Sequence, residues 1–232
     1  MQVYRILIID DERLAREEIK QHLAGYPDFA VAGEATDADT AEGLINELKP
    51  DLLFLDIQMP ERSGIDLLES LETVPEVIFT TAYDQYAVKA FELNALDYLL
   101  KPIRSERFDQ AVARVRSHFN STAATPSLFV KEGDRYHFIR ISDIYLIESA
   151  GNYACLYSGN RKFYVKRSLN QLEKSLNAHS FFRINRTELI NTGYIKQLLS
   201  LPKGKINVVL QNERILEVSG RQSSALRSKL GI

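Results

Sequence analysis

The sequence is poor in several features, and each shortage excludes a class of protein. Its 232 residues include only one cysteine, Cys155. A single cysteine rules out an internal disulfide and a zinc site built from several thiolates, and it suits a reducing compartment. No apolar run reaches the roughly 18 residues that a membrane-spanning helix needs, and the first residues lack a basic leader followed by an apolar core. We therefore expect a cytoplasmic protein that does not enter a membrane.

The first predicted strand–helix junction also lacks glycine. The apolar segment VYRILIID, at 3–10, runs directly into DDERLA at 10–15. A dinucleotide-binding loop needs glycines there so that the backbone can approach a pyrophosphate. A nucleotide-binding Rossmann domain is therefore disfavoured.

Charge is present in quantity and is divided unevenly along the chain. Residues 1–118 carry 12 Lys and Arg against 23 Asp and Glu, whereas residues 119–232 carry 17 against 8. Such asymmetry indicates two domains with different partners, and the basic half is a candidate for binding nucleic acid. The alternative is that the charge excess only keeps each domain soluble.

The acidic half alternates between apolar strand patterns and amphipathic helix patterns. This alternation predicts an α/β domain with a five-stranded parallel sheet covered by helices on both faces. In the first helix, Leu14, Ile19 and Leu23 are expected on the buried face. The predicted strands are 3–10, 29–35, 51–56, 76–82 and 95–100, and the predicted helices are 11–25, 37–49, 63–71, 84–94 and 105–119.

The basic half has a different pattern. A small, polar segment with a proline, residues 119–127, reads as a linker, which gives domains at 1–118 and 128–232. Short β-branched and aromatic strands then follow one another, so this domain is expected to be mainly β. Two helices are predicted, at 168–177 and at 219–231, the second with Ser219 as N-cap and Gly231 as stop. The predicted strands are 128–133, 135–141, 144–149, 153–158, 162–167, 181–185, 196–202, 205–211 and 214–219.

Several polar residues follow the predicted strands of the first domain. Asp10 and Asp11 end the first strand, Asp56 the third, Thr81 the fourth and Lys101 the fifth. The carboxyl ends of parallel strands meet at one edge of a sheet, so these side chains should lie together. Crowded carboxylates repel one another unless a cation such as Mg²⁺ binds them. Asp56 could then act as a carboxylate nucleophile toward a phosphoryl group, whose oxygens Lys101 and Thr81 would contact. The alternative is that Asp10 and Asp11 are only acids favoured at a helix N-terminus.

The segments IIDDE, LLFLDIQMP, TTA and DYLLKP resemble the receiver domain of two-component response regulators, in the order and at the positions typical of that family. The resemblance implies phosphorylation of Asp56 by a sensor histidine kinase. It also implies that Asp11, Asp56 and the Gln58 carbonyl bind Mg²⁺ with help from Asp10. Tyr98 occupies the position of the switch aromatic, which turns inward when Thr81 moves toward the phosphate. A phosphorylation-promoted homodimer is the expected result.

Basic residues lie at strand ends and turns of the second domain, where they could neutralise DNA phosphates. Asn152, Asn185, Arg186 and Arg221 are the candidates for contacts with bases, whereas Phe181, Phe182 and Leu189 are expected in the core. The two histidines of this domain, at 137 and 179, are isolated and are not expected to bind a metal. The segments IESAGNYACLY, KRSLNQLE, FFRINRTELIN and ILEVSGRQ resemble the LytTR DNA-binding domain of LytR/AlgR response regulators. That resemblance implies that loops around Asn152, around Asn185 and Arg186, and at Arg221 face DNA.

Taken together, the sequence predicts a two-component response regulator: a DNA-binding transcriptional regulator controlled by phosphorylation of Asp56. Because the phosphoryl chemistry serves switching, we do not expect an enzyme. Two alternatives stay open. One is a Mg²⁺-dependent hydrolase on the same scaffold, although no independent acid or base is evident. The other is a regulator whose β domain binds protein, in which case binding to a promoter fragment would not weaken with salt.

Overall fold

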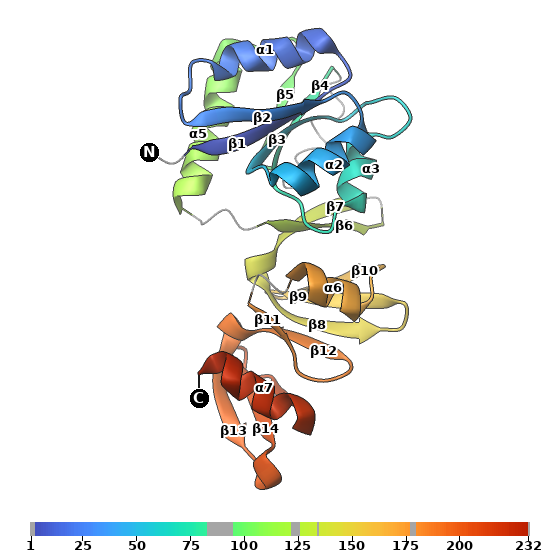
Figure 1. Ribbon diagram of the computed structural model, residues 1–232, viewed down its shortest axis with the longest axis vertical. Helices are drawn as coiled ribbons and strands as arrows, with labels where there is room; N and C mark the ends of the chain where they lie inside the picture. The colour runs from blue at the N-terminus through green and yellow to red at the C-terminus, as the bar shows by residue number, and fades with distance from the viewer. Residues whose placement is uncertain (1–2, 83–94, 122–125, 134, 177–179, 232) are drawn as a thin grey trace. The chain divides into compact units, whose positions relative to one another are not determined.

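The computed structural model describes residues 3–82, 95–121, 126–133, 135–176 and 180–231. By contacts it divides into two compact units, Met1–Phe138 and Ile139–Ile232 (Figure 1). The helix predicted at 84–94 and the histidine at 179 lie outside the described residues. Among the described residues, no helix is both long enough and apolar enough to cross a membrane.

The first unit contains the predicted parallel sheet, with strand order β2-β1-β3-β4-β5. The inner strands β1, β3 and β4 consist mainly of buried residues, as expected where both faces of a sheet are covered, whereas the edge strands β2 and β5 are partly exposed. Helices α2 and α3 pack on one face, and helices α1 and α5 on the other. The elements are β1 (Tyr4–Ile9), α1 (Arg13–Leu23), β2 (Phe29–Ala35), α2 (Ala38–Leu48), β3 (Leu52–Asp56), α3 (Gly64–Ser70), β4 (Glu76–Thr81), β5 (Asp97–Leu100) and α5 (Ser105–Ser121).

One detail of helix α1 differs from the prediction. Leu14 is 74% exposed, whereas Ala15, Ile19 and Leu23 are buried. These three residues are spaced by four, so they form one stripe along the helix, and Leu14 lies about 100° away from it. The prediction for Leu14 was therefore wrong.

A hairpin of two strands, β6 (Ser127–Glu132) and β7 (Arg135–Arg140), follows helix α5. Most of this hairpin groups with the first unit. Phe129 lies in the same apolar cluster as Leu71 and Val74, and the backbones of Ser127 and Val74 exchange hydrogen bonds of 2.8 and 2.9 Å. The domain limits of 1–118 and 128–232 stay a prediction.

The second unit is mainly β, as predicted. It has a five-stranded antiparallel sheet of order β10-β9-β8-β12-β11 and a three-stranded sheet of order β13-β14-β15. Strand β12 was not predicted, although it lies inside the larger sheet. Phe181 and Leu189 are buried and Phe182 packs against the core, as expected. The elements are β8 (Ile144–Ala150), β9 (Tyr153–Ser158), β10 (Arg161–Val165), α6 (Leu169–Leu176), β11 (Phe181–Arg183), β12 (Glu188–Asn191), β13 (Ile195–Ser200), β14 (Ile206–Leu210), β15 (Ile215–Glu217) and α7 (Gly220–Leu230).

Candidate functional site

The carboxyl ends of strands β1, β3, β4 and β5 meet at one edge of the parallel sheet. Ile9 pairs with Leu55, and Asp56 pairs with Thr80, so the strands end at the same level. In this strand order the connections leave β1 and β3 toward opposite sides, which opens a crevice at their ends. Asp10 and Asp56 lie on either side of that crevice, so the predicted acidic residues do converge.

Lys101 is the cation of this site. Its Nζ lies 2.7 Å from Asp56 Oδ2 and 2.8 Å from Asp10 Oδ2. Asp10 is fully buried and Asp56 is 5% exposed. Two carboxylates buried this deeply need compensation for their lost hydration, and one ammonium group shared between them supplies part of it.

Burial and hydrogen bonding together determine the protonation of Asp10 and Lys101. Burial, and to a lesser degree the neighbouring charge of Asp56, raise the pKa of Asp10, although Lys101 opposes the shift. For Lys101, burial favours the neutral amine. The hydrogen bonds to Asp10 and Asp56 outweigh this effect and raise the pKa of Lys101. Lys101 therefore stays charged beside the two acids at neutral pH.

The acids also fit a divalent cation. Asp10, Asp11 and Asp56 each offer a carboxylate oxygen, and these oxygens lie within 4.8 Å of one another. Oxygens that share one octahedral Mg²⁺ are about 3 to 4 Å apart, since each lies about 2.1 Å from the metal. A small closure of this cluster would thus suffice. Gln58 lies next to the cluster, and its backbone N–H donates to Asp56 Oδ1 at 2.9 Å.

Thr81 and Tyr98, the two residues assigned to switching, occupy neighbouring strands. Thr81 is buried at the end of β4, and its carbonyl accepts a hydrogen bond of 2.8 Å from Lys101 N–H. Tyr98 on β5 is half-buried. The Arg107 guanidinium lies 5.4 Å from the centre of the Tyr98 ring. Thr81 thus contacts Lys101 directly through the backbone, whereas Tyr98 lies on β5 three residues before Lys101.

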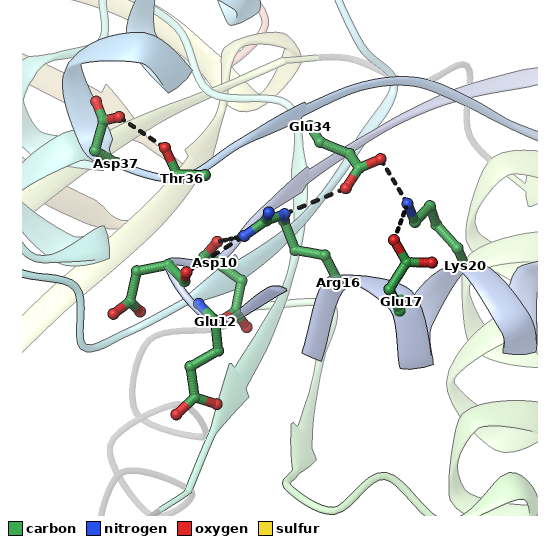
Figure 2. A network of polar contacts seen from close by, with 9 residues as sticks. Asp10, Glu12, Arg16, Glu17, Lys20, Glu34, Thr36 and Asp37 are labelled. Carbon is green, nitrogen blue, oxygen red and sulfur yellow. Dashed lines mark hydrogen bonds and ion pairs between the residues drawn. The ribbon is translucent and has the colours of Figure 1, made fainter. Parts of the chain in front are cut away.

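An ion-pair network supports the loop that carries Asp10 and Asp11 (Figure 2). Arg16 on α1 donates from Nη1 to the Asp10 carbonyl at 2.7 Å and from Nε to Glu34 on β2 at 3.2 Å. Lys20 bonds the other Glu34 oxygen at 2.8 Å. The hydrogen bond from Lys20, followed by that from Arg16, holds the pKa of Glu34 below its ordinary value. The loop is therefore anchored to both the helix and the neighbouring strand.

Gly64 is a site residue that the sequence analysis missed. It begins helix α3 after the N-cap Ser63, and its N–H donates to the Ile57 carbonyl at 3.0 Å. A Cβ placed on Gly64 would lie 2.2 Å from the carbonyl oxygen of Asp56. Only glycine allows the helix to approach the backbone of the acidic site so closely. The available signal was a glycine directly after a serine that could cap a helix.

In the second unit, the predicted DNA-facing residues lie at one end of the two sheets. Strand pairing puts Glu188 opposite Glu148 and Ala150 opposite Tyr153, which brings the loops before β12 and after β8 together. Ser219 N–H donates to the Ile184 carbonyl at 2.9 Å, which adds the start of α7. The pairing of Ser200 with Ile206 places the turn before β14 at the end of the smaller sheet where β15 finishes. We call this set the loop rim: residues 151–152, 184–187, 203–205 and 217–221.

The candidate DNA contacts differ in their surroundings within the loop rim. Asn152, Arg186 and Arg221 are exposed. Asn185 is half-buried, and its side chain makes four hydrogen bonds within the protein. The structure therefore brings all four residues to the loop rim, but the side chain of Asn185 is hydrogen-bonded within the protein.

Three further basic residues lie at the opposite end of the sheets. Arg161 and Lys162, with Arg214 and the rings of Tyr145, Tyr157 and Tyr194, line a cleft of about 620 Å³. Burial, and then the hydrogen bond that its hydroxyl donates to Glu148, raise the pKa of Tyr157 to about 12. Basic residues of the domain thus divide between the loop rim and the far end.

A parallel five-stranded sheet with an acidic, lysine-bearing crevice, followed by a basic β domain, defines a response regulator with a DNA-binding domain. Comparison with known families agrees: residues 6–113 match the response regulator receiver domain, and residues 134–231 match the LytTr DNA-binding domain. The chain belongs to the response regulators of the LytR/AlgR type.

Three relatives are similar along nearly the whole chain. The sensory transduction protein LytT of Enterococcus faecalis is 32% identical over 98% of this chain and 99% of its own length. An uncharacterized response regulatory protein of Vibrio cholerae is 38% identical over 97% of this chain and 98% of its own. The transcriptional regulatory protein BtsR of Escherichia coli is 32% identical over 98% and 99%.

Proposed function

We propose that Asp56 accepts a phosphoryl group from a phosphohistidine of a sensor histidine kinase, and that this event controls DNA binding by the second domain. The observation that carries the proposal is the position of Lys101, whose Nζ lies within 2.8 Å of both Asp56 and Asp10. A cation at this position can contact a group on Asp56 that gains negative charge during reaction.

The reaction requires one bond to form and one to break. A carboxylate oxygen of Asp56 attacks phosphorus, while the bond from phosphorus to the donor's imidazole nitrogen breaks and its electron pair stays on that nitrogen. The product is an acyl phosphate on Asp56. Lys101 then faces the new phosphoryl oxygens, and the Thr81 hydroxyl can donate a hydrogen bond to one of them.

Mg²⁺ is the cofactor that the donor set suits, with Asp10, Asp11, Asp56 and the Gln58 carbonyl as the group that would hold it. The support is the convergence of three carboxylate oxygens within 4.8 Å in a site made of oxygen donors alone. When bound, the metal neutralises charge on the transferring phosphoryl group. Asp10 and Asp11 keep this position through the loop anchored by Arg16.

Phosphorylation then acts as a switch. Thr81 adjoins Lys101 through the backbone, so a shift of Thr81 toward the phosphoryl group would be felt by strand β5 and Tyr98. We propose that the phosphorylated receiver domains pair. Pairing places two basic domains on adjacent DNA sites and raises affinity through effective concentration. The chemistry serves regulation rather than turnover, and the cytoplasm is its location.

For DNA binding we propose that the loop rim faces the duplex. Arg186 and Arg221 are exposed cations in two segments of the loop rim, and Asn152 lies in the turn between strands β8 and β9. Such residues can bond both phosphates and base edges. Asn185 lies at the same rim.

Labelling by a small phosphodonor, acetyl phosphate, tests the acceptor. Wild type with Mg²⁺ should gain one phosphoryl group, measured by intact mass, and Asp56→Asn should gain none. Asp51→Asn is the matched control, because Asp51 directly precedes the same strand at its other end and accepts a hydrogen bond from Arg5 N–H. Labelling of the Asp56 variant at the wild-type rate would move the acceptor elsewhere.

A further inference from the structure

The loop before strand β12 is held by several hydrogen bonds, although part of it is exposed. It runs from 184 to 187 between β11 and β12. At its tip, Arg186 is exposed, and its guanidinium makes no hydrogen bond or ion pair with any residue that the structure describes. The rest of the loop is held in place by hydrogen bonds from Asn185, Arg183 and the neighbouring backbone.

The side chain of Asn185 is fully occupied within the protein. Its Oδ1 accepts from Thr187 N–H at 2.9 Å and from the Thr187 hydroxyl at 3.1 Å. Its Nδ2 donates to the Glu217 carbonyl at 3.0 Å and to Glu188 Oε2 at 2.5 Å. An asparagine amide has two donors and two acceptor positions. No hydrogen-bonding capacity is left for a base.

Arg183 holds the same loop from the other side. Its Nε donates to the Asn185 carbonyl at 3.0 Å and its Nη2 to the Arg186 carbonyl at 2.6 Å. Its Nη1 donates to Asn170 on helix α6 at 2.7 Å. The planar guanidinium, whose side chain is 17% exposed, thus clamps two successive carbonyls against the helix, which the single ammonium of a lysine could not do.

The clamped loop also joins the other parts of the loop rim. Ser149 N–H donates to the Thr187 carbonyl at 2.8 Å, and Ser219 N–H donates to the Ile184 carbonyl at 2.9 Å. The first bond ties the loop to the end of β8, and the second ties it to the start of α7. The loop is therefore the central piece of the rim, and its conformation is set before any ligand arrives.

We propose that Arg183 and Asn185 are positioning residues for DNA binding: they hold the loop so that the Arg186 guanidinium is presented to the duplex, and neither side chain contacts a base. This inference rests on the proposed DNA-binding function. A preformed loop does not have to be ordered during binding, and ordering one rotamer-rich side chain costs about 0.5–1.5 kcal/mol. Loss of the clamp should therefore weaken binding about two- to tenfold.

A double-mutant cycle tests the proposal in the full-length protein. The probe is a duplex selected by the wild type from a randomised DNA library. Asn185→Ala and Arg183→Gln should each weaken binding two- to tenfold. In an Arg186→Ala background the same changes should have almost no effect, because they act through Arg186. The slope of log affinity against log salt should fall in Arg186→Ala if it touches a phosphate, and should keep the wild-type value in Asn185→Ala and Arg183→Gln.

Other outcomes separate the two proposals. If Asn185→Ala weakens binding equally with and without Arg186, or changes the selected sequence at a different base pair, Asn185 reads DNA itself and the positioning role is wrong. An unaffected Arg186→Ala variant would overturn the positioning role as well. A wild type that shows no salt-dependent binding overturns the proposed DNA function and this inference with it. Lys162→Ala, at the far end of the sheets, is the control, and Asn185→Ser replaces Asn185→Ala if thermal unfolding shows a folding defect.

Discussion

Gly64→Ala should disturb both the stability and the chemistry of the acidic site. The new Cβ would lie 2.2 Å from the Asp56 carbonyl oxygen, where ordinary contacts begin at 3.4 Å, and 3.0 Å from Leu55 Cγ. Helix and strand must separate by about 1 Å, and overpacking of this kind costs about 1–3 kcal/mol. At about 2–4 °C per kcal/mol, the melting temperature should fall by roughly 2–12 °C.

The same displacement should slow phosphorylation. The clashing atom belongs to Asp56 itself, whose carboxylate lies 2.7 Å from Lys101. A misplacement of about 1 Å at a reacting group can cost as much as 100-fold in rate. Labelling by acetyl phosphate in the presence of Mg²⁺, followed by intact mass, measures this effect separately from thermal unfolding by circular dichroism.

Gly43→Ala is the matched control for this pair of measurements. Gly43 lies in helix α2 of the same unit, is exposed, and has no other atom within 4 Å of a built Cβ. Alanine there should stabilise the helix by up to about 1 kcal/mol and leave labelling unchanged. Wild-type stability and wild-type labelling in Gly64→Ala would refute the close approach described here.

Three other results are expected. The hydrogen bonds from Arg116 hold the pKa of Asp28 below its ordinary value. This pair therefore stabilises the fold above the ordinary pKa of an aspartate, and its contribution is lost as the pH falls through the lower pKa of the folded state. Arg116→Gln should lower the urea midpoint more at pH 7 than in acid, and an equal loss at both would contradict this. Lys203→Ala, on the loop rim, should lower the salt slope of DNA binding by about 0.9 if it neutralises one phosphate, whereas Lys162→Ala should leave it unchanged. Lys101→Ala leaves two buried carboxylates without their cation and should destabilise the protein by about 3–5 kcal/mol. Added Mg²⁺ should restore part of this stability, measured as a rise in the melting temperature of the variant.

The acidic site could be predicted from the sequence because its residues all follow strands of one parallel sheet. A parallel sheet brings the carboxyl ends of its strands to one edge, so Asp10, Asp56 and Lys101 were expected at the same edge, and the strand order, which puts β1 beside β3, brings Asp10 next to Asp56. The ion pairs between them follow from that edge. Gly64 could not be found in this way, because its importance lies in a distance to the Asp56 carbonyl rather than in a pattern.

The second domain was harder to predict in detail. Strand β12 has four residues, too few to show a period, and its pairing with β8 fixes it in the sheet instead. The hydrogen bond from Asn185 to the Glu217 carbonyl links residues 32 positions apart. A sequence presents Asn185 and Arg186 as two similar polar residues. Only the fold shows that the Asn185 side chain is hydrogen-bonded within the protein, whereas the Arg186 guanidinium has no such partner among the described residues.

The hairpin that carries Phe129 determines where the first domain can safely be cut. A fragment ending at 118 would lack the aromatic ring that covers Leu71 and Val74, and the backbone of Val74 would lose its partner at Ser127. Such a fragment would self-associate through its exposed apolar surface whether or not Asp56 is phosphorylated. Studies of self-association should therefore retain the chain through Phe138. Aggregation through exposed apolar surface is then not mistaken for association caused by phosphorylation.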